Sequence, residues 1–457
     1  MAQQSWHEAR LIPTSGISGA EEQERRATSA LLAVMSAVRE YGRGLIKPLG
    51  APAGSLQTFI EVPFELREKR LFPDGLIRVV RGQKSWTALV EVKTGANQLA
   101  VEQLENYLDI AREHGFDALI TISNEIPAVP GQHPTQIDKR KLKKVALHHW
   151  SWTEVLAAAV MQKEYRGVAD PDQAWILGEL IRYLEHPRSG AMEFDDMGEA
   201  WVGVRDAVSA STLRPTSKGV DQVAARFDAL LRFASLRLGR QLGTEVAPVL
   251  TRADLSDPSR RTQTMVTRLC QDGQLTGAIH VPEAAAPLIV IVDLRARLVS
   301  CHVDIDAPRE GRPTTRVKWL VRQLVNAPAG LRVEASVAHA RGANAAEQLG
   351  AVRERPELLA SPEGKDLRRF RLALSAPMGV KRGRGRGSFI DSVLTCVDTF
   401  YSDVLQDLKV WSAAPPKLRQ PDADDLPTKE QPTRAPLVST GFSSQDDPVH
   451  DTPTQTG

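Results

Sequence analysis

The chain has 457 residues, of which 25% are charged and 42% are hydrophobic, a composition typical of a soluble protein with two or three domains. Its 58 basic and 56 acidic side chains leave a net charge of +2, so the overall charge does not indicate a polyanionic partner. No apolar run approaches the roughly 18 residues that span a membrane, and the first residues lack the apolar segment of a signal peptide. We therefore expect a cytoplasmic protein with no membrane partner.

The first predicted elements are a helix and three strands. Residues 19–41 have helical periodicity, with an apolar stripe formed by Ala27, Leu31, Val34, Met35 and Val38. The elements that we predict after it are, in chain order, strand 55–64, charged loop 65–73, strands 75–80 and 86–93, helix 98–115, strand 116–123, strand 145–150 and helix 151–164. The order is α-β-β-β-α-β, with one further β-α pair.

For the remaining chain we predict a helical connector, a second domain and a C-terminal tail. Residues 166–245 form a helical connector, with its clearest helices at 172–186 and 223–243. Residues 246–412 form a second α+β domain, with strands within 262–305, helix 314–325, strands 331–340 and 366–375, and helix 388–408. Residues 413–457 are Pro-rich, polar and nearly free of large apolar side chains, so we predict a disordered tail.

The three cysteines are far apart in the sequence and include no C-x-x-C pair: Cys270, Cys301 and Cys396. This spacing predicts neither a zinc site nor a disulfide framework. We expect small core residues in a reducing compartment.

Three charged residues on two predicted strands indicate a site. Side chains alternate along a strand, so Glu91 and Lys93 share one face of strand 86–93. Burying them in an apolar strand is costly unless they are paired or bind a ligand. Asp74 begins the preceding strand, where its carboxylate could lie across from Glu91, and a hard cation such as Mg²⁺ would relieve the repulsion between the two.

Each signal also has an ordinary structural interpretation. The tripeptide "PDG" that contains Asp74 is common in turns. An E-x-K sequence such as Glu91 to Lys93 is often an ion pair on a solvated strand edge. The combination, in this order and on these elements, favours a site over either alternative.

The sequence "PDG…EVK", together with the α-β-β-β-α-β order over residues 19–123, resembles the PD-(D/E)xK signature of the restriction-endonuclease-like nuclease superfamily. The resemblance covers residues 15–165 and implies an α/β domain with a restriction-endonuclease-like core. It also implies that Asp74 and Glu91 hold Mg²⁺, with Mn²⁺ as an alternative, and that Lys93 assists the attacking water. The Val92 carbonyl is a further metal ligand by the same comparison.

The same resemblance extends to residues on the two helices. Members of the superfamily often add a glutamate from the first helix, and the apolar stripe of residues 19–41 extended back by one heptad reaches Glu24. Gln103 and Tyr107 lie four apart on helix 98–115 and resemble a Q-x-x-x-Y element that orients the site and the DNA. The alternative is that Tyr107 is a core aromatic and Gln103 a surface residue.

Several other segments carry charges or histidines. The basic run "KRKLKK" suits phosphate contacts, although such a run is usually a solvated face; its basic residues are Lys139, Arg140, Lys141, Lys143 and Lys144. His148 and His149 point to opposite faces of one strand, so core or surface positions are expected rather than a shared metal. We interpret "KRGRGRG" at 381–387 as a flexible loop that either grips nucleic acid or is simply a long turn, and Asp195 and Asp196 as loop residues and helix caps.

The predicted function is Mg²⁺-dependent hydrolysis of phosphodiester bonds in nucleic acid, with DNA favoured over RNA, in DNA processing, a stress response or defence. The alternative is a catalytically inactive protein that keeps the nuclease fold for nucleic-acid binding or regulation. The second α+β domain could bind a protein partner.

Overall fold

The computed structural model describes residues 11–14, 19–337, 345–360 and 366–413. The described residues up to Trp411 belong to one compact unit. The predicted disordered tail lies outside the described residues, apart from its first position. Among the described residues no helix is both long and apolar enough to cross a membrane.

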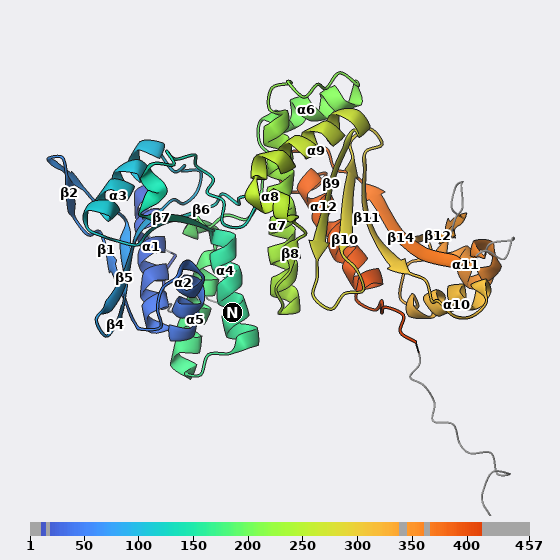
Figure 1. Cartoon of the computed structure of the whole chain (residues 1–457), viewed down its shortest axis with the longest axis horizontal. Helices are drawn as coiled ribbons and strands as arrows, with labels where there is room; N and C mark the ends of the chain where they lie inside the picture. Colours follow the sequence, from blue (N-terminus) through green and yellow to red (C-terminus); the bar gives the residue numbers. More distant parts are fainter. Residues whose placement is uncertain (1–10, 15–18, 338–344, 361–365, 414–457) are drawn as a thin grey trace, which may run out of the picture. The chain divides into compact units, whose positions relative to one another are not determined.

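The described part of the chain has a mixed α/β fold built on two main sheets (Figure 1). The first sheet has the strand order β1-β4-β5-β6-β7. Its strands are β1 (Ser55–Ile60), β4 (Gly75–Arg81), β5 (Lys84–Val92), β6 (Ala118–Ser123) and β7 (Ala146–Ser151). β1, β4 and β5 pair antiparallel, whereas β6 and β7 run parallel to β5. The carboxyl ends of β5, β6 and β7 therefore lie at one edge of this sheet.

Helices cover both faces of the first sheet. They are α1 (Ala20–Ala37), α2 (Arg39–Ile46), α3 (Val101–Glu113), α4 (Trp152–Val160) and α5 (Pro171–Glu185), with short helical turns at Lys47–Leu49, Lys141–Lys143, Met161–Arg166 and Pro187–Ser189. Val90 and Val92 face a core that they share with α1, α4 and α5. Leu89 faces the other way, into a core shared with α3. The alternation of β5 thus buries both of its faces, which explains its continuous apolar sequence.

The segment predicted as a charged loop is instead a hairpin, formed by β2 (Phe64–Leu66) and β3 (Lys69–Leu71). Phe64 and Leu66 are buried against the α3 side of the sheet, which anchors the hairpin. Its turn places Arg67 and Glu68 at φ values of 47° and 68°, a left-handed conformation. Glycine or asparagine usually occupies such positions, so a turn at these two charged residues was not predicted from the sequence.

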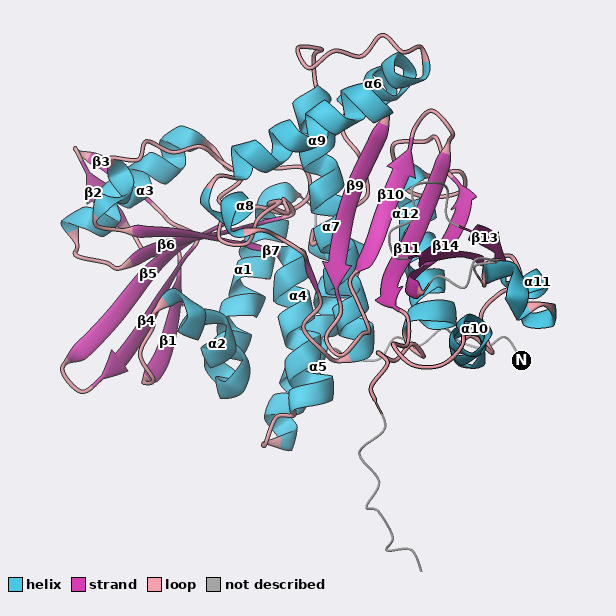
Figure 2. Ribbon diagram, turned by 45° about the vertical axis from the view of Figure 1, so that its right-hand side comes forward, coloured by secondary structure: helices cyan, strands magenta, loops and turns pink. Residues whose placement is uncertain are grey.

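The second sheet is antiparallel throughout and has the order β13-β12-β14-β11-β10-β9-β8. Figure 2 shows β9, β10 and β11 side by side. Its strands are β8 (Ala247–Pro248), β9 (Gln274–His280), β10 (Leu288–Asp293), β11 (Leu298–Asp306), β12 (Arg332–Val337), β13 (Ala345–Gln348) and β14 (Leu367–Pro377). The accompanying helices are α6 (Ala200–Ser209), α7 (Val220–Leu242), α8 (Arg252–Ser256), α9 (Pro258–Asp272), α10 (Pro313–Gln323), α11 (Leu349–Glu354) and α12 (Phe389–Phe400), with turns at Pro356–Leu359 and Tyr401–Leu405.

Helix α9 occupies the start of the region 262–305, where we predicted strands. The Asp257 side chain accepts a hydrogen bond from the Ser259 N–H and caps the helix, and Pro258 follows at its first position. Gly273 ends it at a φ of 71°. These are ordinary helix start and stop signals, and they outweigh the weak strand pattern of the segment.

The predicted helical connector, residues 166–245, is divided between two cores. Leu177, Leu180 and Tyr183 of α5 pack into the core of the first sheet. Helices α6 and α7 pack into the core of the second sheet instead. The domain limits 15–165, 166–245 and 246–412 remain predictions. Of the three cysteines, all of them free, Cys301 and Cys396 are buried and Cys270 is partly exposed.

Candidate active site

Asp74 and Glu91 lie opposite each other at the edge of the first sheet. Gly75 pairs with Val90 in the antiparallel register of β4 and β5, so the next residues outward are Asp74 and Glu91. Asp74 Oδ2 accepts a hydrogen bond from the Val92 N–H at 2.7 Å. The structure therefore brings the aspartate of "PDG" and the glutamate of "EVK" to one place.

The glycine of "PDG" allows helix α1 to pack closely against the start of β4. Gly75 is buried, and a Cβ on it would lie 2.4 Å from Leu32 Cδ1 of α1. Its φ is not positive, so the constraint is the close approach of the helix rather than a left-handed turn. Helix α1 can thus lie against β4 beside Asp74, which brings Glu24 to the same edge of the sheet.

Glu91 is a buried carboxylate with little hydrogen-bonding support. It is 1% exposed, and its Oε1 lies 2.7 Å from Lys93 Nζ. The Lys93 ammonium therefore neutralises Oε1, whereas Oε2 accepts no hydrogen bond from the described residues. Burial, and then the charge of Asp74, raise the pKa of Glu91 to about 8, although Lys93 acts in the opposite direction.

Asp74 has a perturbed pKa for related reasons. Burial raises the pKa of Asp74, while the Val92 N–H and the charge of Lys93 partly offset that effect. Two neighbouring carboxyl groups with raised pKa values resist simultaneous ionisation. A cation placed between them would relieve this electrostatic cost.

Lys93 lies between two carboxylates. Its Nζ is 2.7 Å from Glu91 Oε1 and 3.4 Å from Glu24 Oε2. Burial by itself favours the neutral amine, but Glu91 and Glu24 outweigh this effect, so the pKa of Lys93 is raised. Lys93 is therefore an ammonium at neutral pH and a donor of hydrogen bonds rather than a base.

Glu24 is held in place by the loop that follows β5. Its Oε1 accepts hydrogen bonds from Asn97 Nδ2 at 2.5 Å and from the Thr94 N–H at 3.4 Å. Trp152 Nε1 donates to the Lys93 carbonyl at 2.9 Å, which fixes the same stretch of backbone. No periodic pattern or motif in the sequence connects Asn97, Thr94 or Trp152 to Glu24, so none of the three was predicted as a site residue.

Gln103 and Tyr107 act on the backbone that leads to Asp74. Gln103 Nε2 donates to Tyr107 Oη at 3.2 Å, and Tyr107 Oη donates to the Phe72 carbonyl at 3.1 Å. Burial, followed by the charge of Glu91, raises the pKa of Tyr107 to about 12. Tyr107 is thus a buried residue that fixes the segment carrying Asp74, and Gln103 orients its hydroxyl.

The residues at this edge fit a Mg²⁺ ion held by few protein ligands. Glu91, whose Oε2 accepts no hydrogen bond from the described residues, and the nearby carboxylate of Asp74 would supply hard oxygen donors. No group of three or more His, Cys, Asp or Glu side chains within the described ranges could hold a metal ion. Mg²⁺ commonly uses one or two carboxylates and completes its shell with water and substrate phosphate. The Val92 carbonyl stays a predicted ligand.

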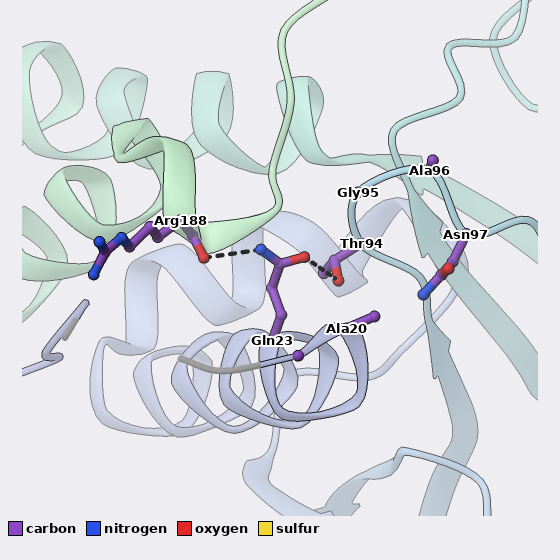
Figure 3. A pocket seen from close by; sticks show the side chains of 8 residues that line it. Ala20, Gln23, Thr94, Gly95, Ala96, Asn97 and Arg188 are labelled. Atoms are coloured by element: carbon purple, nitrogen blue, oxygen red, sulfur yellow. Dashed lines mark hydrogen bonds between the residues drawn. The ribbon is translucent and has the colours of Figure 1, made fainter. Parts of the chain in front are cut away.

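Two open grooves adjoin Glu24. One has a volume of about 480 Å³ and is lined by Glu21, Glu24, Arg25, Thr28, Ile60, Glu61, Phe72, Pro73 and Asp74. The other, of about 490 Å³, lies beside the start of α1 and is lined by Gly19, Ala20, Gln23, Thr94, Gly95, Ala96, Asn97 and Arg188 (Figure 3). Figure 3 shows Gln23 joining Thr94 to the Arg188 carbonyl, through hydrogen bonds of 3.0 Å each. Only the first groove reaches a carboxylate of the Asp74–Glu91 pair.

The basic run lies away from the carboxylates. Ala146 pairs with Ala118, which pairs with Ala88, and the three strands are parallel. Lys144 therefore lies about five residues, or about 16 Å along the strands, from Glu91. This distance separates the run from the edge that carries the candidate site.

Two members of the basic run are engaged in ion pairs. Lys141 Nζ is 2.6 Å from the buried Asp109 Oδ2, and Arg140 pairs with Asp138 at 2.7 Å. Lys141 therefore neutralises a buried carboxylate, and its interpretation as a phosphate contact stays a prediction. Lys139, Lys143 and Lys144 are exposed, and their role stays a prediction.

The histidines that follow the basic run form hydrogen bonds within the sheet. His149 Nδ1 and His133 Nε2 each lie 2.8 Å from Thr121 Oγ1, and His149 Nε2 lies 3.0 Å from the Glu125 carbonyl. A carbonyl only accepts, so His149 Nε2 carries a proton and, in the neutral ring, Nδ1 accepts from Thr121. Burial lowers the pKa of His149 to about 4.

The loop 381–387 forms ion pairs and backbone hydrogen bonds with neighbouring segments. Arg382 pairs with Asp196 at 3.1 Å, and Arg384 pairs with Glu193 and Asp391. Its backbone also bonds to residues 195 and 197. Asp196 therefore holds this loop, and its Oδ1 also accepts from the Gly198 N–H.

Comparison of the chain with protein-family models, with curated proteins and with solved structures finds no match. The resemblance to the PD-(D/E)xK superfamily consequently stays a prediction from the motif and the order of elements. The geometry of four residues is what supports a function: Asp74, Glu91, Lys93 and Glu24.

Proposed function

We propose that the protein is a Mg²⁺-dependent nuclease that hydrolyses phosphodiester bonds of DNA, on a restriction-endonuclease-like core at residues 15–165. The observation that carries the proposal is the Asp74–Glu91 pair, two neighbouring carboxyl groups of which Glu91 is nearly inaccessible and is ion-paired through Oε1 with Lys93. The pKa of both carboxyl groups is raised even with Lys93 present, so a further cation at this edge would relieve the cost of ionising both. The order α1-β1-β4-β5-α3-β6 around the pair supports the proposed core.

The chemistry divides among the residues at the edge of the sheet. Asp74 and Glu91 would hold the ion, with Mn²⁺ as an alternative to Mg²⁺. The ion would supply Lewis-acid activation of the phosphodiester and of the attacking water. Lys93, an ammonium with three donors, would stabilise negative charge that develops on the phosphate.

Two residues act by positioning the others. Glu24 accepts from Lys93 Nζ and from Asn97, which keeps the ammonium at the edge of the sheet. Tyr107 holds the Phe72 carbonyl, two residues before Asp74. Neither residue needs to touch the phosphate for these roles.

One observation favours the alternative of an inactive protein that binds nucleic acid or has a regulatory role. Lys93 already lies within ion-pair distance of Glu91 and Glu24, so its ammonium neutralises part of the charge that a metal would otherwise balance. In that case the fold would bind nucleic acid without cleaving it, with or without a divalent cation.

Cleavage assays separate the two functions. Wild type, Asp74→Ala, Glu91→Gln and Lys93→Ala are incubated with linear, circular and single-stranded DNA and with RNA, in Mg²⁺, Mn²⁺ or EDTA. We expect Mg²⁺-dependent cleavage by the wild type and a loss of about a hundred-fold or more in each variant. Lys84→Ala, which removes an exposed lysine at the start of the same strand, is the matched control and should cleave normally.

The outcomes lead to different conclusions. Equal cleavage by wild type and all three site variants would show that a different site or a contaminant acts. Metal-independent binding without cleavage would favour the inactive alternative.

A further inference from the structure

An exposed aromatic side chain borders the candidate site. Phe72 is 50% exposed, lies two residues before Asp74 and lines the same groove as Asp74 and Glu24. Ile60, which is 44% exposed, lines this groove as well, and its backbone pairs with Gly75 across β1 and β4. The groove thus combines carboxylates with an apolar surface that water reaches.

The position of Phe72 is fixed by two interactions. Its carbonyl accepts the hydrogen bond from Tyr107 Oη, which ties its backbone to α3. The guanidinium of Arg70 lies 5.1 Å from the centroid of its ring. This cation–π contact places a positive charge beside the ring and restricts its orientation. The backbone of Phe72 and the orientation of its ring are therefore both restricted.

The charges of the groove select what can lie against Phe72. Four carboxylates and one guanidinium line it, those of Glu21, Glu24, Glu61, Asp74 and Arg25. Arg25 is itself paired with Glu61 at 2.7 Å and with Glu21 at 3.2 Å. Such a lining repels additional backbone phosphates and favours an uncharged, planar group. A nucleobase has these properties, and base–aromatic stacking does not depend on sequence.

We propose that Phe72, with Ile60 beside it, is a stacking surface for an unpaired nucleobase next to the scissile phosphate. In a duplex the base faces are already stacked, so this surface would select single-stranded nucleic acid or frayed ends. This inference rests on the proposed function and assigns to it a substrate class.

The test uses the full-length chain and two fluorescein-labelled probes, a 12-nucleotide single strand and the corresponding 12-base-pair duplex. Affinity is measured by anisotropy in EDTA, which prevents cleavage, and a single strand containing 2-aminopurine reports stacking through quenching. The variants are Phe72→Ala, Phe72→Leu and Phe72→Trp. Phe59→Ala is the matched control, because Phe59 is 44% exposed on β1 but does not line the groove.

We expect Phe72→Ala and Phe72→Leu to bind the single strand about ten-fold more weakly and to lose the quenching, while duplex affinity stays constant. Phe72→Trp should retain both properties, and Phe59→Ala should behave as the wild type. The leucine variant keeps a large apolar side chain, so weaker single-strand binding by Phe72→Leu would show that the aromatic ring itself is required. Because Phe72 is half exposed, thermal unfolding of the variants should match the wild type and exclude a folding defect.

Two results would overturn the inference and leave the nuclease proposal intact, provided that the wild type cleaves DNA in Mg²⁺. One is unchanged single-strand affinity in Phe72→Ala. The other is an equal loss on the single strand and the duplex. A wild type that neither binds nor cleaves any nucleic acid would instead overturn the proposed function and this inference together.

Discussion

Asp74 Oδ2 accepts the main-chain N–H of Val92 at 2.7 Å, so one carboxylate joins the start of β4 to the end of β5. The same hydrogen bond sets Asp74 beside Glu91, because Val92 is the next residue on β5. Asp74 therefore has a structural role through Oδ2, beside the role in holding a metal that we propose for its charge. The two roles can be separated by mutation.

Asp74→Asn keeps an oxygen acceptor for the Val92 N–H but removes the negative charge. We expect it to unfold at nearly the wild-type temperature and to lose Mg²⁺-dependent cleavage. Asp74→Ala removes the acceptor as well, which should lower the free energy of unfolding by about 1–2 kcal/mol. Thermal and urea denaturation beside a cleavage assay distinguishes the two variants. Equal stability of Asp74→Asn and Asp74→Ala would show that the hydrogen bond contributes nothing.

Glu91→Gln should stabilise the metal-free protein while abolishing the effect of metal. The pKa of Glu91 is raised to about 8 even beside Lys93, so a neutral amide removes the cost of ionising this group near neutral pH, and we expect a gain of about 1 kcal/mol in EDTA at pH 8. Mg²⁺ at ten times its dissociation constant should stabilise the wild type by about 1.4 kcal/mol and leave Glu91→Gln unchanged.

Differential scanning calorimetry with EDTA or MgCl₂ measures both effects. Glu65→Gln, which changes an exposed glutamate of β2, is the control for the loss of one negative charge. A metal shift that survives in Glu91→Gln would place the metal elsewhere.

The hydrogen bonds of Tyr107 predict that Tyr107→Phe reduces stability and cleavage rate more than Gln103→Ala does. Tyr107→Phe removes the donor to the Phe72 carbonyl, so it should cost about 1 kcal/mol of stability and reduce the rate of cleavage. Gln103→Ala leaves that bond intact and should have a smaller effect on both quantities. Because Tyr107 positions Asp74 without touching the substrate, we expect kcat to fall more than KM changes. A larger defect in Gln103→Ala than in Tyr107→Phe would contradict this assignment.

The stability of the fold should depend on His149 below neutral pH. Burial lowers the pKa of His149 from about 6.5 in the unfolded chain to about 4 in the folded one, and nearby His133 and Arg232 act in the same direction. The unfolded state consequently binds more protons between these values. The contribution of His149 to the free energy of unfolding is therefore complete above pH 6.5 and falls as the pH drops towards 4.

We expect a loss of about 2 kcal/mol from this group, after allowing for the part of the ring that solvent reaches. Urea denaturation from pH 7 to pH 4 measures it. His149→Gln, which keeps a neutral donor and acceptor, should flatten the pH dependence. His280→Gln, at an exposed position, should not. Parallel pH profiles for wild type and His149→Gln would show that another group is responsible.

Local pattern was enough to place the elements that carry the candidate site. The helical stripe that contains Leu31 and Met35 predicted α1, and the alternation of strand residues placed Glu91 and Lys93 on one face of β5. Glu24 could be chosen by extending that stripe. The hairpin at 64–71 and helix α9 were missed or misassigned, because a left-handed turn at charged residues and a capped polar helix give weak periodic signals.

By itself the sequence determined which residues share a helix stripe or a strand face, because backbone geometry repeats every 3.6 or 2 residues. Only the tertiary structure decided which of these faces meet. In the folded protein Glu24 accepts a hydrogen bond from Asn97, and Tyr107 donates one to the Phe72 carbonyl. Lys141 forms an ion pair with Asp109, and Asp196 forms one with Arg382 of the loop 381–387. These contacts connect segments far apart in the chain, where close packing and charge pairing select the partner and no local period records the choice.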